Sequence, residues 1–164
     1  MAASTRVKNF RNGTLKVEDG AALTLTLSEC KGDFSITGLS AAQRDVAPVL
    51  VRGLLYDLVK ADQTFPEVSF TLLLNDVHDV ANQTAWDAFT RQGAWAAATT
   101  TFGSAATADP YTVKLTWTIE GTDLGDGSDH VIVMDDVHIK AASKEGDPNE
   151  LSASGVVYGS ITLT

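Results

Sequence analysis

The sequence has 164 residues, 44% hydrophobic and 20% charged, which is the composition of one globular domain that can bury a core without disulfides or a metal. Its formal net charge of −9 argues against tight nucleic-acid binding, and its single cysteine, Cys30, excludes an internal disulfide. No apolar run is long enough for a membrane span or a secretory signal, so we expect a soluble protein made in a cytoplasm.

The N-terminal part of the chain has the alternating pattern of β-strands. Arg6–Phe10 and Thr14–Glu18 flank an Asn-Gly pair, which predicts an opening hairpin. From Ala21 to Glu29, leucines alternate with Thr and Ser, which predicts a half-buried strand. A Lys-Gly-Asp turn then leads into Phe34 and Ile36, which share one face of the next strand.

The stretch from Gly38 to Pro66 allows two interpretations. Val46–Arg52 and Leu54–Lys60 around Gly53 favour a hairpin, whereas Ala41–Val51 could form a short helix interrupted at Pro48. In the hairpin, the flanking segments Leu39–Asp45 and Ala61–Phe65 become extensions suited to contacts with neighbours. Candidate residues for contacts between subunits in this region are Arg44, Arg52 and Asp57.

One further strand and one helix follow. Glu67–Asn75 alternates Val, Phe and Leu with polar residues and predicts a strand near the centre of the sheet. Thr84 begins a capping-box pattern, and Gly93 can end the helix. Trp86 and Phe89 share one face of that helix, where we expect them to pack on the core. Residues 94–108 are rich in Ala and Thr and predict a loop or an irregular edge strand.

The C-terminal third predicts long strands at Tyr111–Thr122, His130–Ala142 and Leu151–Thr164, joined by turn-rich segments. A final strand with nothing after it to cover its edge invites pairing with another subunit. The whole chain, residues 1–164, is therefore predicted to be one mainly β domain. The expected fold is a β-sandwich or a partly closed antiparallel barrel with one short α-helix.

Motifs of most enzyme classes are missing from the sequence, so we expect a protein without catalytic activity or cofactor. It has no Gly-rich phosphate loop, no nucleophile-elbow serine and no paired cysteines. The exception is a repeated Asp-Val-His, whose weak candidate metal ligands are Asp76, His78, Asp136 and His138. Residues two apart on a strand point the same way, so two such triplets could form a metal site, although strand ends at which polar residues meet water also explain them.

The order of elements resembles the major tail tube protein of long-tailed, non-contractile bacteriophages. The matching features are a strand ending near Leu74-Asn75, a helix with Thr84-Ala85-Trp86, an Ala/Thr-rich connection and three long strands. The most specific part is the Glu145-Gly146-Asp147-Pro148-Asn149 turn with the strand after it, through Gly155-Val156-Val157-Tyr158-Gly159. The resemblance covers nearly the whole chain.

This resemblance implies a structural subunit that forms hexameric rings, which stack into a tube in the virion tail after assembly in the host cytoplasm. DNA would leave through the channel without specific binding, and tape measure, terminator and distal tail proteins would be partners. A tube protein of type VI secretion systems is similar in fold and is the nearest alternative. The family has no catalytic residues, and this sequence offers none.

Two other classes of function stay open at this stage. A carbohydrate- or partner-binding β-sandwich would remain monomeric, and a metal-dependent enzyme would need the two Asp-Val-His triplets. For the tube interpretation, a net acidic or neutral channel is expected, because the subunit is acidic. The candidate seam between subunits is the final strand, with Gly155, Val157, Tyr158, Ile161 and Leu163.

Overall fold

The structure is a computed structural model, and it describes residues 13–27, 34–40, 43–74, 77, 82–103, 110–119 and 127–164. Strands predominate, with one short α-helix and one turn of 3-10 helix. In chain order the elements are β1 (Thr14–Glu18), β2 (Thr24–Leu27), β3 (Ser35–Thr37), β4 (Arg44–Val51), β5 (Leu54–Gln63), β6 (Glu67–Leu73), α1 (Ala85–Thr90), η2 (Gly93–Trp95), β7 (Val113–Ile119), β8 (His130–Lys144), β9 (Glu150–Val157) and β10 (Ile161–Leu163).

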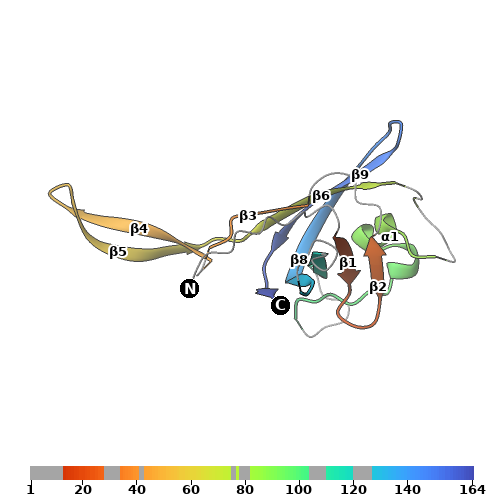
Figure 1. The fold of residues 1–164 in the computed structure, drawn as a ribbon, viewed down its shortest axis with the longest axis horizontal. Coiled ribbons are helices and arrows are strands. Elements are labelled where there is room, and N and C mark those ends of the chain that lie inside the picture. The colour runs from red at the N-terminus through yellow and green to blue at the C-terminus, as the bar shows by residue number, and fades with distance from the viewer. Residues whose placement is uncertain are drawn as a thin grey trace.

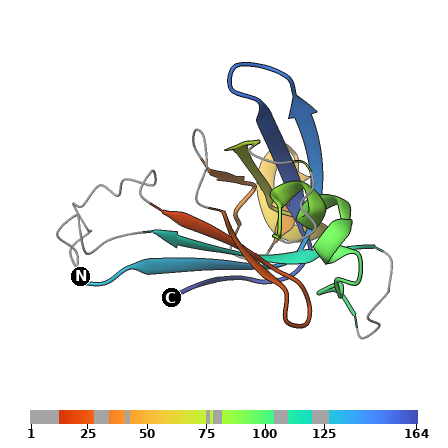
Figure 2. The same cartoon turned by 90° about the vertical axis from the view of Figure 1, so that its right-hand side faces the viewer.

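The body of the molecule is an antiparallel sheet folded into two layers at strand β8. The strand order is β2-β1-β7-β8-β9-β6-β3, and β10 also pairs with β8. The first half of β8 pairs with β7 and β10, and its second half pairs with β9. Between these halves Asp136 adopts a left-handed backbone conformation with φ of 53°, which bends the strand. Figure 2 shows the resulting layers crossing steeply.

The core lies between the two layers and follows the predicted alternation. Strand β7 buries alternate residues from Val113 to Ile119, and β6 buries Val68, Phe70 and Leu72. Phe34 bridges the layers, since its ring centroid lies 4.3 Å from that of Trp117 and 5.7 Å from that of Phe70. The prediction of a mainly β, sandwich-like fold is confirmed, and the sheet is open because β2 and β3 end the strand order.

Helix α1 covers one mouth of the sandwich, as predicted. The Thr84 hydroxyl accepts a hydrogen bond from the Asp87 amide at 3.1 Å, which is the capping interaction expected from the sequence. Phe89 is buried and its ring centroid lies 6.0 Å from that of Phe70, and Trp86 packs at the core edge. The prediction that Gly93 ends the helix is wrong, because the left-handed residue Arg91 already caps it.

The segment after helix α1, residues 93–103, differs in part from the sequence-based prediction. Gly93 begins the 3-10 helix η2, which includes the first two residues of the predicted loop or edge strand, and the described residues 96–103 form a loop as predicted. Trp95 within η2 is fully buried. Trp95 was missed as a core residue because its neighbours are small and lack a clear period. Near this segment, Tyr111 ties the helix to the sheet: its hydroxyl donates to the Ala88 carbonyl at 3.1 Å, and burial raises its pKa.

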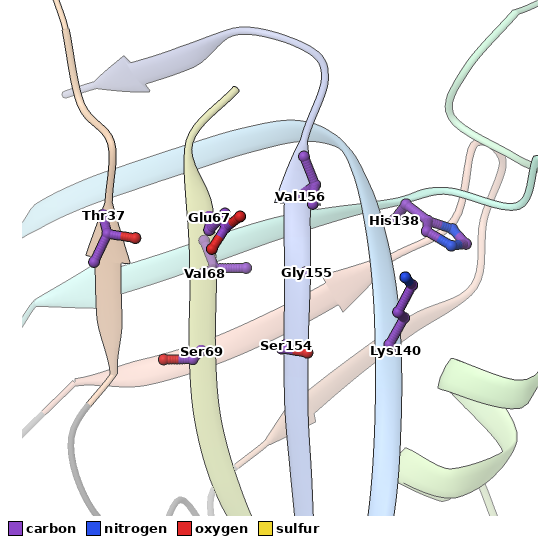
Figure 3. A pocket seen from close by; sticks show the side chains of 9 residues that line it. All are labelled: Thr37, Glu67, Val68, Ser69, His138, Lys140, Ser154, Gly155 and Val156. Carbon is purple, nitrogen blue, oxygen red and sulfur yellow. The ribbon is translucent and has the colours of Figure 1, made fainter. Parts of the chain in front are cut away.

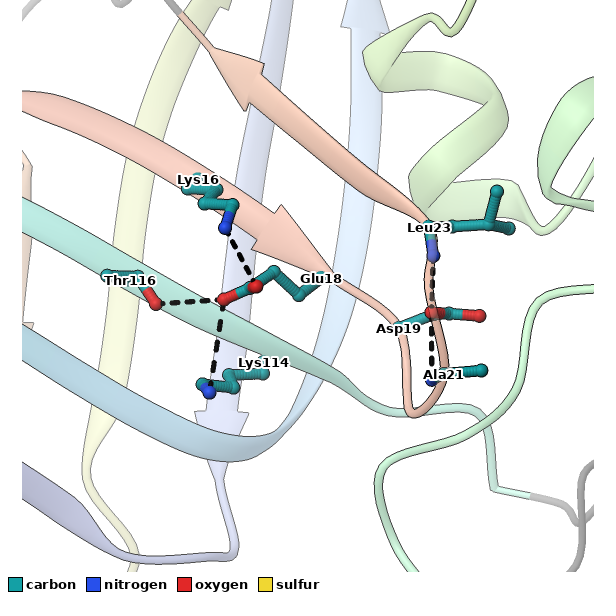
Figure 4. Close-up of polar contacts among 7 residues, drawn as sticks. All are labelled: Lys16, Glu18, Asp19, Ala21, Leu23, Lys114 and Thr116. Carbon is teal, nitrogen blue, oxygen red and sulfur yellow. Dashed lines mark hydrogen bonds and ion pairs between the residues drawn. The ribbon is translucent and has the colours of Figure 1, made fainter.

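Two polar groups organise the β1 to β2 connection, as Figure 4 shows. Asp19 is buried, and its carboxylate accepts hydrogen bonds from the amides of Ala21, Leu23 and Thr99, each at 2.9 Å. Next to it, Glu18 accepts a hydrogen bond from Lys16 Nζ at 2.8 Å. This hydrogen bond from Lys16 holds the pKa of Glu18 below its ordinary value of 4.5. The hydrogen bond from the Thr99 amide to Asp19 thus fixes the loop at Thr99 to the end of β1.

Two predicted strand arrangements are wrong. Strand β1 pairs with β2 on one edge and β7 on the other, so Thr14–Glu18 has no free edge for the predicted hairpin partner, whose residues 6–10 lie outside the described residues. The long strand predicted for Leu151–Thr164 is divided into β9 and β10. Gly159 makes this division possible, because a Cβ there would lie 2.7 Å from the Asp135 carbonyl oxygen.

Candidate assembly surfaces

The predicted central hairpin is correct, and it forms an arm that projects from the body (Figure 1). Among the described strands, β4 and β5 pair only with each other, and the helix considered for Ala41–Val51 is wrong where the structure describes that range. The tip is a two-residue turn in which Arg52 and Gly53 have φ of 53° and 80°. Such a turn matches the twist of paired strands and therefore closes a regular hairpin.

Both faces of the arm are apolar and exposed. On one face Pro48 pairs with Leu58 and Leu50 pairs with Leu55; on the other face Val51 pairs with Leu54. Every residue of β4 is exposed. The large apolar side chains left open to solvent are Val46, Val49, Leu50, Val51, Leu54, Leu55, Tyr56, Leu58 and Val59. A ribbon with two apolar faces is typical of strands that are covered on both sides, and an isolated hairpin is marginally stable in water.

The arm is also electrically neutral, whereas the chain as a whole is acidic. Its basic and acidic residues are equal in number and lie mostly at its root: Arg44, Arg52 and Lys60 against Asp45, Asp57 and Asp62. A neutral apolar segment can approach a subunit of net charge −9 without long-range repulsion. The predicted contact residues Arg44, Arg52 and Asp57 therefore all lie on this exposed hairpin.

A β-bulge lies close to the tip of the arm. Val49 pairs with Asp57 and Leu50 pairs with Leu55, so Tyr56 has no partner on β4. The Tyr56 side chain is 76% exposed. A bulge redirects a side chain away from the regular ladder. Tyr56 is thus an aromatic residue presented to solvent by the backbone of the arm.

A second surface is the outer face of the layer formed by β3, β6, β9 and the second half of β8. Alternation and register place Lys140, Ser154, Ser69 and Ser35 in one row across four strands. We call this surface the hydroxyl-rich face after the small side chains that dominate it: Ser35, Thr37, Ser69, Thr71, Ser152 and Ser154.

The charges on the hydroxyl-rich face balance. Lys140 and Lys144 from β8 share this side of the sheet with Glu67 and Glu150. A cleft of about 260 Å³ lies on this face. Figure 3 shows His138 and Lys140 on one side of it and Glu67 on the other. His138 Nδ1 lies 3.0 Å from the Tyr111 carbonyl oxygen, so this nitrogen donates to the backbone. Among the described residues, this face is polar and solvent-exposed, and its charges form no stripe of one sign.

A third surface is an apolar cleft of about 360 Å³ at the root of the arm. Its aromatic walls are Phe65, Phe102 and Tyr158, and the rings of Phe65 and Tyr158 meet edge to face with centroids 4.9 Å apart. These side chains are 37%, 51% and 42% exposed, respectively. The remaining lining residues are uncharged: Gln63, Pro110 and Thr112. We call this site the aromatic cleft.

The predicted C-terminal seam is divided between core and surface. Gly155 and Val157 are buried between the layers, so they do not lie on a surface that another subunit can reach. Tyr158 lines the aromatic cleft, and Ile161 and Leu163 belong to β10. Strand β10 pairs with β8 along one edge, and Leu163 is 70% exposed. Within the part of the chain that the structure describes, β10 is an edge strand.

The metal-site hypothesis gains no geometric support. Asp76 and His78 lie outside the described residues, and among those described no group of metal-ligating side chains comes together. In the other triplet, Asp136 is the left-handed residue at the bend of β8. Asp136 and His138 therefore do not form the regular two-residue repeat that the hypothesis requires.

Comparisons with known proteins identify the fold. No protein-family model and no curated sequence matches the chain. Its structure is similar to a chain in a cryo-EM structure of an extracellular contractile injection system, the PVC sheath/tube terminator in the extended state. The TM-score is 0.53 at 9% sequence identity, over 99% of both chains. Within the described residues, no helix is long and apolar enough to cross a membrane.

Proposed function

We propose that this chain is a non-catalytic structural subunit of a tail tube, as in the major tail tube proteins of non-contractile bacteriophages. In this proposal the subunits form hexameric rings that stack around a channel, and DNA passes through it without specific binding. Tape measure, terminator and distal tail proteins would be its partners in the virion tail.

The observation that carries the proposal is the arm. Its apolar side chains are exposed on both faces, the described part of the subunit does not cover them, and contacts with other chains would bury them. The open edges β3 and β10 can add strands from neighbours, as in a ring that closes by rotation. The shared fold with a chain of a sheath/tube terminator assembly supports the same class of function.

The hydroxyl-rich face suits the wall of such a channel. Its small hydroxyl side chains keep water, and its two lysines and two glutamates cancel, so six copies would present no basic stripe to phosphate. DNA would then move past a hydrated surface without being held. The strands that would line the channel in this proposal are β3, β6, β9 and the second half of β8. Their balanced charges fit the sequence-based expectation of an acidic or neutral channel.

Electron microscopy of the purified protein at increasing concentration tests the proposal. We expect rings or tubes, whereas a carbohydrate- or partner-binding β-sandwich would stay monomeric. The matched variant lacks the arm: a short Gly-Ser linker joins Gln43 to Thr64, which are adjacent because the Thr64 amide donates to the Gln43 carbonyl at 2.9 Å. This variant should fold with a similar thermal transition and form neither rings nor tubes. A fully folded wild type that remains monomeric would refute the proposal.

A further inference from the structure

Two features near the ends of the arm complement each other in shape and chemistry. At the tip, the bulged Tyr56 presents an exposed ring; at the root, the aromatic cleft is open and uncharged. We propose that Tyr56 of one copy of this chain inserts into the aromatic cleft of a second copy. This inference rests on the proposed function, because it names a specific contact by which the subunits would assemble.

The cleft has the properties of a receptor for an aromatic side chain. Its walls are Phe65, Phe102 and Tyr158, whose exposed edges can stack with or meet an incoming ring. Its volume of about 360 Å³ is enough for one large side chain with part of its neighbour. A tyrosine in such a pocket keeps its hydroxyl near the rim, where the exposed Gln63 side chain offers polar atoms.

Geometry requires the ring and the cleft to come from different copies. Tyr56 and Gln63 lie on the same extended strand, β5, seven positions apart, which separates them by about 23 Å at about 3.3 Å per residue. The arm extends away from the body in Figure 1, so its tip does not fold back on its own root. A tip-to-root contact therefore joins one copy to the next.

Such a contact is heterologous and repeats. Each copy has one tip and one root, so a bound pair still has a free tip at one end and a free root at the other. Further copies can add there until the contacts close into a ring or continue as a stack. The contact also avoids charge repulsion, because the arm has equal numbers of acidic and basic residues and the described residues that line the cleft are uncharged. An acidic subunit can associate with itself through this pair of surfaces.

Photo-crosslinking tests the contact directly. Tyr56 is replaced by p-benzoylphenylalanine, and this protein is mixed with wild type labelled with ¹⁵N and irradiated under assembly conditions. We expect crosslinks from the unlabelled arm to labelled peptides that contain Phe65, Phe102 or Tyr158. Crosslinks confined to other residues, or to unlabelled chains alone, would overturn the inference. Micrographs of the same sample separate the two claims, since tubes with crosslinks elsewhere refute only the contact.

Substitutions give an independent measure. Tyr56→Ala should raise the critical concentration for assembly at least about 10-fold, as for a buried aromatic anchor, and Tyr56→Phe should keep it near the wild-type value. Phe102→Ala should have a similar effect, and the double variant should be little worse than the more severe single variant, because both remove one contact. Additive losses would show that Tyr56 and Phe102 do not meet.

Discussion

Replacing Leu58 or Leu54 by serine tests whether both faces of the arm are buried in the assembly. These residues lie on opposite faces, because Leu58 pairs with Pro48 and Leu54 pairs with Val51, and Pro48 and Val51 are an odd number of positions apart on β4. Both are exposed in the subunit, so serine should change its folding little. The effect should appear in assembly.

The magnitude follows from the exposed fraction of each side chain. Leu58 is 59% exposed and Leu54 is 75% exposed, and complete burial of a leucine contributes about 1.5–3 kcal/mol. Burial, on assembly, of the leucine surface that is exposed in the free subunit should therefore contribute about 1–2 kcal/mol per side chain to the free energy of assembly. Its loss should raise the critical concentration about 5- to 30-fold. Sedimentation of tubes over a concentration series measures this quantity.

The controls for this experiment are Leu58→Met and Leu54→Met, which keep an apolar side chain of similar size and should assemble almost as wild type does. Thermal unfolding of each serine variant should match that of the wild-type subunit. If only one serine variant assembled poorly, the arm would lie flat on a neighbour by one face. If both assembled normally, the arm would not be an assembly surface.

Three further predictions concern the body of the subunit. Asp19→Ala leaves three backbone amides without their acceptor and should lower the free energy of unfolding by about 2–4 kcal/mol in chemical denaturation, with Asp19→Asn losing less; equal stability would contradict this role. The pKa of Glu18 is lowered in the folded state, so its contribution is present above the ordinary value of 4.5 and lost as pH falls below it. Glu18→Gln should therefore destabilise the protein at pH 7 and not at pH 3, and a loss that is the same at both pH values would refute the assignment. Leu163→Asp, on the edge strand β10, should block tube formation seen by electron microscopy while leaving the unfolding temperature nearly unchanged, and normal tubes would exclude that edge from the interface.

An experiment that tests the predicted C-terminal seam between subunits must leave the core of the subunit intact. Truncation after Gly155 would remove Val157, which is fully buried, so it would damage the subunit itself as well as the seam. A surface substitution at Leu163 separates the two effects. The sequence pattern predicted one continuous strand over Leu151–Thr164. The close approach of Gly159 to Asp135 shows that the regular pairing with β8 is interrupted there, between β9 and β10.

Much of the local structure was predictable because its signals are local. Alternation assigned the buried faces of β6 and β7, Thr84 marked the start of α1, and Gly53 marked the tip of the hairpin. The mainly β class followed from the same patterns. These features depend on side-chain period and on turn chemistry, which neighbouring residues determine.

The tertiary structure decided the features that depend on distant residues. Examples are the pairing of β1 with β7, the burial of Trp95 and the bend of β8 at Asp136. Each depends on segments that lie far apart in the chain. The sequence also could not show that the arm projects from the body. A hairpin that is apolar on both faces has the same sequence pattern whether it is buried in a core or exposed to solvent. Exposure is a property of the whole fold, and it is exposure that makes the arm and the aromatic cleft candidate assembly surfaces.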